Sequence, residues 1–398
     1  MARISEDAIV IVGMARTAVG GFQGALASVP APELGAVAIR AAVQRAGVDA
    51  GDVAEVLMGC VLPAGLGQAP ARQAAIGAGL PQSVPATTVN KMCGSGMKTV
   101  MMAYDALHAR AKDVMVAGGM ESMSNAPYLL PKMRGGARLG HAEVKDHMFL
   151  DGLECAFDKG RLMGTFAEDT AQHYQFTRAA QDAFATESLT RAKRANEDGS
   201  FDRELAAVAV NTRRGTSNIE QDEQPFTADP TKITSLKPAF RKDGTVTAAN
   251  SSSISDGAAA LVLMCASEAK RRKLRPLAKI VGTATHAQAP AWFTTAPIGA
   301  MQKLLKDIGW DAKDVDLFEI NEAFAVVTMA AMRDLDLPHA KVNVHGGACA
   351  LGHPVGASGA RIIVTLLAAL EKYDKTRGVA SLCIGGGEAT AVAIERIG

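Results

Sequence analysis

The chain has 398 residues, a net charge of +1, 48% hydrophobic residues and only 5% aromatic residues. This balance argues against a nucleic-acid partner, which is recognised through phosphate neutralisation or base stacking. Six cysteines without regular spacing do not suggest a disulfide framework, and the N-terminus resembles no secretory or transit signal. The longest apolar run, 258–266, is too short to span a membrane, so we expect a soluble cytoplasmic protein.

Short apolar runs alternate with helical stretches along the chain. Strands are expected at 9–12, 53–58, 84–89, 113–117, 315–320 and 379–384, and helices at 33–45, 97–107, 177–196 and 298–307. This alternation predicts a layered α/β fold with substantially parallel strands that are buried on both faces.

Part of the chain recurs near its end. Segments 46–53, 94–100 and 113–119 are echoed in the same order by 308–315, 357–363 and 379–385. Chance can supply one such match, but three in order indicate a duplication. Two such halves would pack their inner helices against each other and form a layered sandwich.

The segment 123–249 has no counterpart in the second half. It holds stretches rich in Pro, Gly and charge around the helix expected at 177–196. We interpret it as an inserted loop domain that covers the site and binds the non-reacting part of a substrate. The predicted division is a first half of 1–122 plus 250–275, the insertion 123–249, and a second half of 276–398.

Cys93 lies between an extended stretch and a helical one, within Asn-Lys-Met-Cys-Gly-Ser-Gly. A helix N-terminus favours a thiolate over a thiol, and the thiolate is the nucleophilic form. The position of Cys93 before a helix therefore suggests covalent catalysis, and the alternative is a buried structural cysteine.

His353 lies among glycines before a second helix, as Cys93 does before the first. A neutral imidazole there can accept the thiol proton. The alternative is a zinc site with His345 and Cys349, but that spacing needs a helix and the glycine-rich stretch is a poor one.

Two further strand ends carry polar groups. Cys383 opens Cys-Ile-Gly-Gly-Gly, whose backbone N–H groups can bind an oxyanion, and its thiol can move a proton unless it is only a buried strand-end cysteine. Asn321 can orient water or donate to an oxyanion, and Glu322 is either a base or a helix-capping acid. One crevice between the halves could hold Cys93, Asn321, His353 and Cys383.

These motifs, in this order, resemble the thiolase family from end to end, including Gly-Thr-Val-Thr-Ala-Ala-Asn at 244–250. The resemblance implies duplicated βαβ halves in a five-layered α/β/α/β/α arrangement with an inserted loop domain. It implies an acyltransferase that condenses two acetyl-CoA reversibly to acetoacetyl-CoA plus CoA through an acetyl-Cys93 intermediate. Coenzyme A thioesters would be its substrates, with no cofactor and no metal, and relatives imply a homotetramer.

The family assigns a role to each matching residue. The cysteine matching Cys93 is acylated, the histidine matching His353 activates that thiol, and the cysteine matching Cys383 moves the α-proton. The enolate oxygen is held by that histidine and by a water on the asparagine matching Asn321. A second oxyanion site uses the backbone N–H groups matching Cys93 and Gly385.

Other matching positions imply contacts to coenzyme A and the acyl group. They are Met163, Lys232, Ala248, Ser252, Ile254, Phe293, Ala323 and Phe324. Phe293, with Trp292 beside it, suggests a short acyl chain. The chain departs from the family at Leu162, where many relatives have His, and at Glu388, where relatives often have a further Gly. Leu189 stands where potassium-activated members have Tyr, so no cation is predicted.

Two other functions are alternatives to this one. A decarboxylating ketosynthase shares the doubled fold, but it uses histidine near the Asn321 position and lacks the second cysteine. A catalytically silent lipid- or CoA-binding relative would have lost Cys93, His353 or Cys383, and all three are present.

Overall fold

A computed structural model describes residues 7–213 and 215–397. The strands of the main sheet are β1 (Ile9–Thr17), β2 (Gly20–Gly21), β3 (Glu55–Gly59), β4 (Ala86–Val89), β5 (Val114–Ser122), β8 (Leu205–Ala206), β11 (Ser255–Cys265), β12 (Ala278–Ala287), β13 (Leu317–Ile320), β14 (Arg377–Ile384) and β15 (Glu388–Arg396). The helices of the two halves are α1 (Ala31–Ala46), α2 (Pro70–Gly77), α3 (Ser95–His108), α7 (Ala266–Arg271), α8 (Ala296–Ile308), α9 (Ala325–Asp334), α10 (Ala348–Leu351) and α11 (Val355–Lys372). In this described part the main sheet has 11 strands.

The halves repeat one topology. The sheet runs β13-β14-β15-β12-β1-β11-β5-β3-β4, so the order β1-β11-β5-β3 of the first half is matched by β12-β15-β14-β13 in the second. The helices α1 and α8 both end at a left-handed glycine, Gly47 at φ 66° and Gly309 at φ 70°. The duplication inferred from the sequence is therefore present in the fold, and β1 pairs with β12 to join the halves.

The expectation of substantially parallel strands is wrong for part of each half of the main sheet. β3 is parallel to β4 and β5, and β13 is parallel to β14. β11 and β15 are antiparallel to both of their neighbours. In the second half β15 follows β14 through a glycine hairpin, a connection too short for a parallel crossover. Hydrophobic runs alone do not reveal strand direction, because a buried strand is apolar in either direction.

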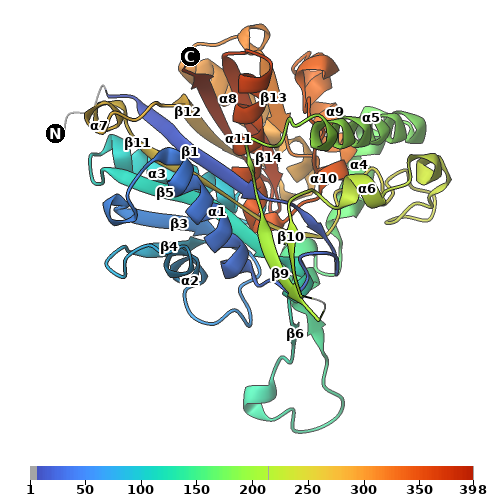
Figure 1. The fold of residues 1–398 in the computed structure, drawn as a ribbon. Helices are drawn as coiled ribbons and strands as arrows, with labels where there is room; N and C mark the ends of the chain where they lie inside the picture. The colour runs from blue at the N-terminus through green and yellow to red at the C-terminus, as the bar shows by residue number, and fades with distance from the viewer. Residues whose placement is uncertain (1–6, 214, 398) are drawn as a thin grey trace.

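The layers number five, as the resemblance implies. α1 and α2 cover the outer face of the first sheet half, α8 and α9 cover that of the second, and α3 and α11 fill the space between (Figure 1). The two central helices approach closely, because a Cβ at Gly359 would lie 2.4 Å from the Met97 nitrogen. This contact brings the N-terminal ends of α3 and α11, and thus Cys93 and His353, to one place.

The insertion between β5 and β11 forms its own elements. They are β6 (Tyr128–Leu129), β7 (Lys145–Asp146), α4 (Met163–Tyr174), α5 (Arg178–Glu197), β9 (Val208–Thr212), β10 (Gly215–Ile219) and α6 (Gln224–Thr227). α5 matches the expected helix. Its N-cap residue is Thr177, whose side-chain oxygen accepts a hydrogen bond from the Ala180 N–H. The β6–β7 hairpin extends away from the body (Figure 1). Across the described residues, no helix is both long and apolar enough to cross a bilayer.

Candidate active site

An apolar cavity lies where the halves and the insertion meet. It is lined by Cys93, Met123, Gly152, Leu153, Met163, Ser252, Ser253, Ile254, Phe293, Ala323, Phe324, His353, Val355 and Gly385. The first half contributes the thiol, the second half contributes the imidazole and the glycine loop, and the insertion contributes one wall. The site is therefore composite, and neither half contains it alone.

Cys93 lies on the turn between β4 and α3, directly after Met92, which has a left-handed φ of 46°. Ser95 Oγ accepts from the Lys91 N–H at 2.9 Å and donates to the Met92 carbonyl at 2.6 Å, and these bonds close the turn. Burial raises the pKa of the Cys93 thiol to about 11, although the N–H groups of Gly385 and Cys93 itself counteract this rise. The sequence suggested a thiolate at this position, and the structure corrects that expectation. Desolvation raises the pKa of Cys93 more than the helix N-terminus lowers it, so the resting group is a thiol.

His353 precedes α11 and is buried. Its Nδ1 lies 2.6 Å from Ser358 Oγ, and the Ser358 hydroxyl donates to the Pro354 carbonyl at 2.9 Å. The serine proton is committed to that carbonyl, so Nδ1 must be the N–H donor and Nε2 must carry the lone pair. Burial, with a smaller contribution from Arg361, lowers the pKa of His353 to about 3, which keeps the ring neutral.

The Cys93 thiol and the His353 imidazole both rest uncharged. Nε2 of His353 has no hydrogen-bond partner among the described residues, and His353 and Cys93 line the same cavity. A lone pair held in the correct tautomer can take the thiol proton when a substrate carbonyl arrives. His353 could thus convert the Cys93 thiol to a thiolate when a substrate binds.

Asn321 follows β13 and lies beside the imidazole. Its Nδ2 is 3.5 Å from His353 Nδ1, a contact rather than a strong hydrogen bond. Its Oδ1 is buried and accepts no hydrogen bond from the described residues. An unpaired buried amide oxygen is a place where a polar ligand or a water is stabilised.

Cys383 lies near the end of β14. It is fully buried in one apolar cluster with Phe293, Ala323 and Phe324. Burial raises its pKa well above the usual range, and the nearby Cys93 sulfur raises it further. The two sulfurs are therefore close enough to influence each other, as a shared crevice requires.

Most residues matched to coenzyme A or acyl contacts reach the cavity, but two do not. Lys232 and Ala248 instead line a separate surface hollow beside Ile233. The Lys232 side chain is exposed and pairs with Asp229 at 3.3 Å. Trp292, expected beside the acyl pocket, lies against His173 with its ring centroid 5.1 Å away. Side-chain direction in an irregular loop is not encoded by neighbours in sequence, which is why these placements could not be read in advance.

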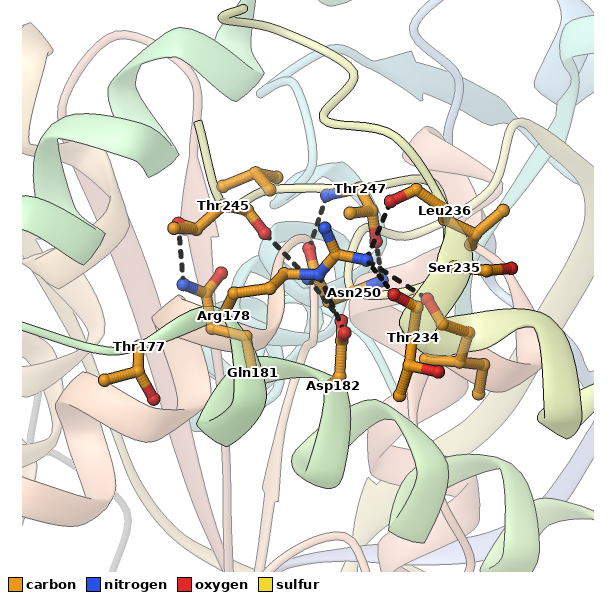
Figure 2. A network of polar contacts seen from close by, with 12 residues as sticks. Thr177, Arg178, Gln181, Asp182, Thr234, Ser235, Leu236, Thr245, Thr247 and Asn250 are labelled. Carbon is orange, nitrogen blue, oxygen red and sulfur yellow. Dashed lines mark hydrogen bonds and ion pairs between the residues drawn. The ribbon is translucent and has the colours of Figure 1, made fainter. Parts of the chain in front are cut away.

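The loop that carries Ser252 and Ile254 is anchored to α5, as Figure 2 shows. Gln181 Nε2 donates to Thr245 Oγ1 at 2.8 Å, and Asn250 Nδ2 donates to Asp182 Oδ1 at 3.1 Å (Figure 2). Arg178 Nε binds the other oxygen of Asp182 at 2.7 Å, so the helix and the loop share one polar network. The network explains why the 244–250 motif carries the polar side chains of Thr245 and Asn250.

Sequence reasoning missed the residues that hold the catalytic turns. Ser358 and Ser95 were visible only as part of an internal echo. Glu121, on β5, accepts the N–H groups of Val61 and Gly356 at 2.9 Å each, and so ties the first half to the start of α11. Burial raises the pKa of Glu121 to about 7. A lone buried acid in an apolar strand was the available signal.

Glu322 is not a free base, and it does not cap α9, the helix that follows it in the chain. Its carboxylate accepts from Ser188 Oγ at 2.7 Å, from Asn343 Nδ2 at 2.8 Å and from the Cys349 N–H at 3.1 Å. A fully bonded buried carboxylate holds the local backbone in place. The zinc alternative also fails, because no set of three or more His, Cys, Asp or Glu side chains in 7–213 and 215–397 is arranged to hold a metal ion.

A doubled α/β fold that presents a Cys–His pair beside a glycine loop is the arrangement of an enzyme that works through a covalent cysteine intermediate. Family models agree with this class. The thiolase N-terminal domain model matches residues 9–267, and the thiolase C-terminal domain model matches residues 274–396. The chain belongs to the thiolase family.

Individual relatives are similar over nearly the whole chain. Acetyl-CoA acetyltransferase of Cupriavidus necator is 50% identical over 392 residues, which cover 98% of this chain and 99% of the relative. The cytosolic acetyl-CoA acetyltransferase of Mus musculus is 47% identical, with coverage of 98% and 99%. The crystal structure of Bacillus anthracis acetyl-CoA acetyltransferase has a TM-score of 0.96 at 40% identity and covers 99% of this chain and 100% of that one.

Proposed function

We propose that this thiolase is an acetyl-CoA C-acetyltransferase, which condenses two acetyl-CoA reversibly to acetoacetyl-CoA plus CoA. The observation that carries the proposal is the convergence of Cys93, His353 and Gly385 on one apolar cavity, with Cys383 in the buried cluster that includes Phe293, Ala323 and Phe324 of its wall. Full-length similarity to acetyl-CoA acetyltransferases supports the substrate.

The first half-reaction transfers the acetyl group to the enzyme. His353 Nε2 takes the proton of the Cys93 thiol as the sulfur attacks the thioester carbonyl. The C–S bond to CoA breaks, and the departing CoA thiolate takes the proton from the imidazolium. The N–H groups of Gly385 and Cys93 favour the negative charge on the Cys93 sulfur, and we assign them to stabilise the carbonyl oxygen of the acyl group as it develops negative charge.

The second half-reaction forms the carbon–carbon bond. The thiolate of Cys383 removes an α-proton from a second acetyl-CoA, and the resulting carbon attacks the acetyl carbonyl on Cys93. The C–S bond to Cys93 breaks, and the released thiolate is reprotonated. The enolate oxygen is stabilised by Nε2 of His353 in its protonated form and by a water on the free Oδ1 of Asn321. Because Cys383 rests as a buried thiol and Cys93 is acetylated at this stage, the Cys383 proton first passes to His353 Nε2, and the imidazolium returns it to the Cys93 thiolate after condensation.

The size of the cavity supports a short acyl group. Its volume is about 70 Å³, and Phe293 and Met163 form part of its wall. Phe293 is buried and packs edge-on against Phe166 at a centroid distance of 6.2 Å, so it is not free to swing away. Longer acyl chains would need this ring to move.

Several wider properties belong to the same proposal. Acetyl-CoA and acetoacetyl-CoA are the partners, coenzyme A thioesters are substrates rather than cofactors, and neither metal, nucleic acid nor membrane takes part. We place the protein in the cytoplasm as a homotetramer. Exposed apolar side chains on the extended hairpin region, including Tyr128, Leu139 and Val144, support assembly through the insertion. Light scattering in solution tests the assembly directly.

The activity is tested by adding CoA to acetoacetyl-CoA in the presence of magnesium. A thiolase removes the absorbance of the acetoacetyl-CoA–magnesium enolate, and a series of longer 3-ketoacyl-CoA substrates should be cleaved progressively more slowly. No CoA-dependent decrease would contradict the proposal and favour a binding protein. Decarboxylation of a malonyl thioester would instead favour a ketosynthase.

A further inference from the structure

The loop that carries Cys93 and the glycine loop after Cys383 meet at several points. The Gly385 N–H points at the Cys93 sulfur. Ile384 packs against Gly94 so closely that a Cβ on that glycine would lie 2.3 Å from Ile384 Cδ1. At the outer side of these contacts, Lys91 Nζ forms an ion pair with Glu388 Oε2. Lys91 is two residues before the nucleophile, and Glu388 is the first residue of β15.

The glycine loop needs such a link because it has no side chains of its own. Gly386 and Gly387 have φ values of 99° and 90°, which only glycine adopts readily. Three consecutive glycines can also occupy many other conformations, so the position of the Gly385 N–H depends on what holds the loop ends. Both ends of the loop lie in the β14–β15 ladder, where Ile384 pairs with Glu388, so the ion pair of Glu388 acts at the base of the glycine hairpin.

The other partner of the ion pair is rigid. The Lys91 backbone is bound twice, since its N–H donates to Ser95 Oγ at 2.9 Å and its carbonyl accepts from the Gly94 N–H at 3.0 Å. The cation of Lys91 therefore extends from a fixed point on the nucleophile turn to the base of the glycine hairpin. Its side chain is 22% exposed and that of Glu388 is 35% exposed.

We propose that Lys91 and Glu388 are positioning residues that hold the Gly385 N–H at the Cys93 sulfur and thereby set the rate of Cys93 acylation. The inference rests on the proposed function and deepens it. Neither side chain lines the cavity, so the pair acts through the loop rather than on the substrate. A partly exposed ion pair contributes little to global stability, but oxyanion donors are sensitive to small displacements.

The test compares Lys91→Met, Glu388→Gln and the double variant with Glu395→Gln. Glu395 lies on the same strand and pairs with Lys279 at 3.0 Å with similar exposure, so it is a matched control. Acylation by acetyl-CoA is followed by rapid quench and intact mass. Each single change should slow acylation about tenfold, a fraction of the loss expected for removing an oxyanion donor. KM for acetyl-CoA should stay within about twofold, as for a group that acts only on the transition state.

The double variant and a conservative variant make the test specific. If the two residues act as one unit, the double variant is no slower than either single variant. Lys91→Arg keeps the ion pair and should retain most of the rate. Losses that multiply in the double variant would overturn the proposal. Rates within about twofold of the Glu395→Gln control, or a raised KM with unchanged kcat, would also overturn it.

Two further measurements complete the test, one that needs no activity and one that needs no variant. Amide hydrogen exchange in the 384–388 segment should be faster in Glu388→Gln than in Glu395→Gln, and equal exchange contradicts the proposal. This readout remains valid if the unmodified protein proves unable to react with acetyl-CoA, a result that would overturn only the proposed function. In the unmodified protein, raising salt from about 0.05 to about 0.5 M should slow acylation by screening the pair, and a salt-independent rate counts against it.

Discussion

The turn before α3 and the turn before α11 are two copies of one structure with different chemistry. In each, a serine of the first helical turn donates to a backbone carbonyl just upstream, Ser95 to Met92 and Ser358 to Pro354. In the first copy the serine also accepts from a backbone N–H, and in the second it accepts from the imidazole of His353. Duplication has therefore placed a nucleophile and its base on equivalent turns, with Cys93 two residues before Ser95 and His353 five residues before Ser358.

A second difference lies in the connection to the last strand of each half. Between β5 and β11 the chain inserts the segment that forms one wall of the cavity, whereas β14 and β15 are joined by Gly385, Gly386 and Gly387. The long connection gives a surface that can bind a large substrate. The short connection gives backbone N–H groups at the reacting atoms. Equivalent positions thus diverged into binding and catalysis because they open onto the same crevice.

The largest effect should come from replacing Cys93 and Cys383 with serine, one at a time. Cys93→Ser should lower acylation by on the order of a thousandfold or more, because a hydroxyl is a far weaker nucleophile than a thiol. Cys383→Ser should still be acetylated but should barely condense. Intact mass after mixing with acetyl-CoA separates the two outcomes, and full acetylation of the Cys93→Ser protein would break the assignment.

Ser358→Ala tests the second copy of the turn. Without its acceptor, Nδ1–H no longer enforces the tautomer that leaves Nε2 free, so acylation should fall by roughly ten- to a hundredfold with KM little changed. Ser381→Ala removes another buried hydroxyl of the same half, which donates to the Thr390 carbonyl, and serves as the control. Equal rates in the two variants would show that Ser358 does not orient the base.

Gly119→Ala tests how tightly the halves are joined. A Cβ there would lie 2.0 Å from the Gly356 carbonyl, where the first half meets α11, and backbone cannot yield cheaply. We expect a loss of about 1–3 kcal/mol or more in the free energy of unfolding. Gly257→Ala, whose nearest neighbour would be at 3.4 Å, is the control. Denaturant unfolding at equal protein concentration measures both, and equal stability would mean that the halves can separate without strain.

The smallest expected effect is the change in the ionisation of the Cys93 thiol with pH. Since burial raises the pKa of Cys93 to about 11, its thiolate should form only well above neutral pH. Thiolate ultraviolet absorbance, taken as the difference between the unmodified protein and Cys93→Ser, should therefore increase with pH through about 11 and remain flat below about 9. A transition below the ordinary thiol pKa of about 8.5 would show that the helix N-terminus dominates instead.

Much of the site was predictable because it is encoded locally. The strand–turn–helix pattern around Cys93, the glycines around His353 and the glycine loop after Cys383 are all visible in short windows. The duplication was equally visible, since two copies of a sequence imply two copies of a topology. Of the residues predicted to contact coenzyme A or the acyl group, Ser252 and Ile254 line the same cavity as Cys93, whereas Lys232 and Ala248 line a separate hollow.

The sequence by itself determined the elements, the doubled order and the identity of the reacting groups, because these depend on periodicity and on residue type. Only the tertiary structure decided which strands run antiparallel, which tautomer His353 holds and whether Cys93 rests as a thiol. Those properties depend on burial and on hydrogen-bond partners far apart in the chain. Desolvation and long-range contacts have no signature in a local window, so the chemistry of the turn was decided by what folds against it.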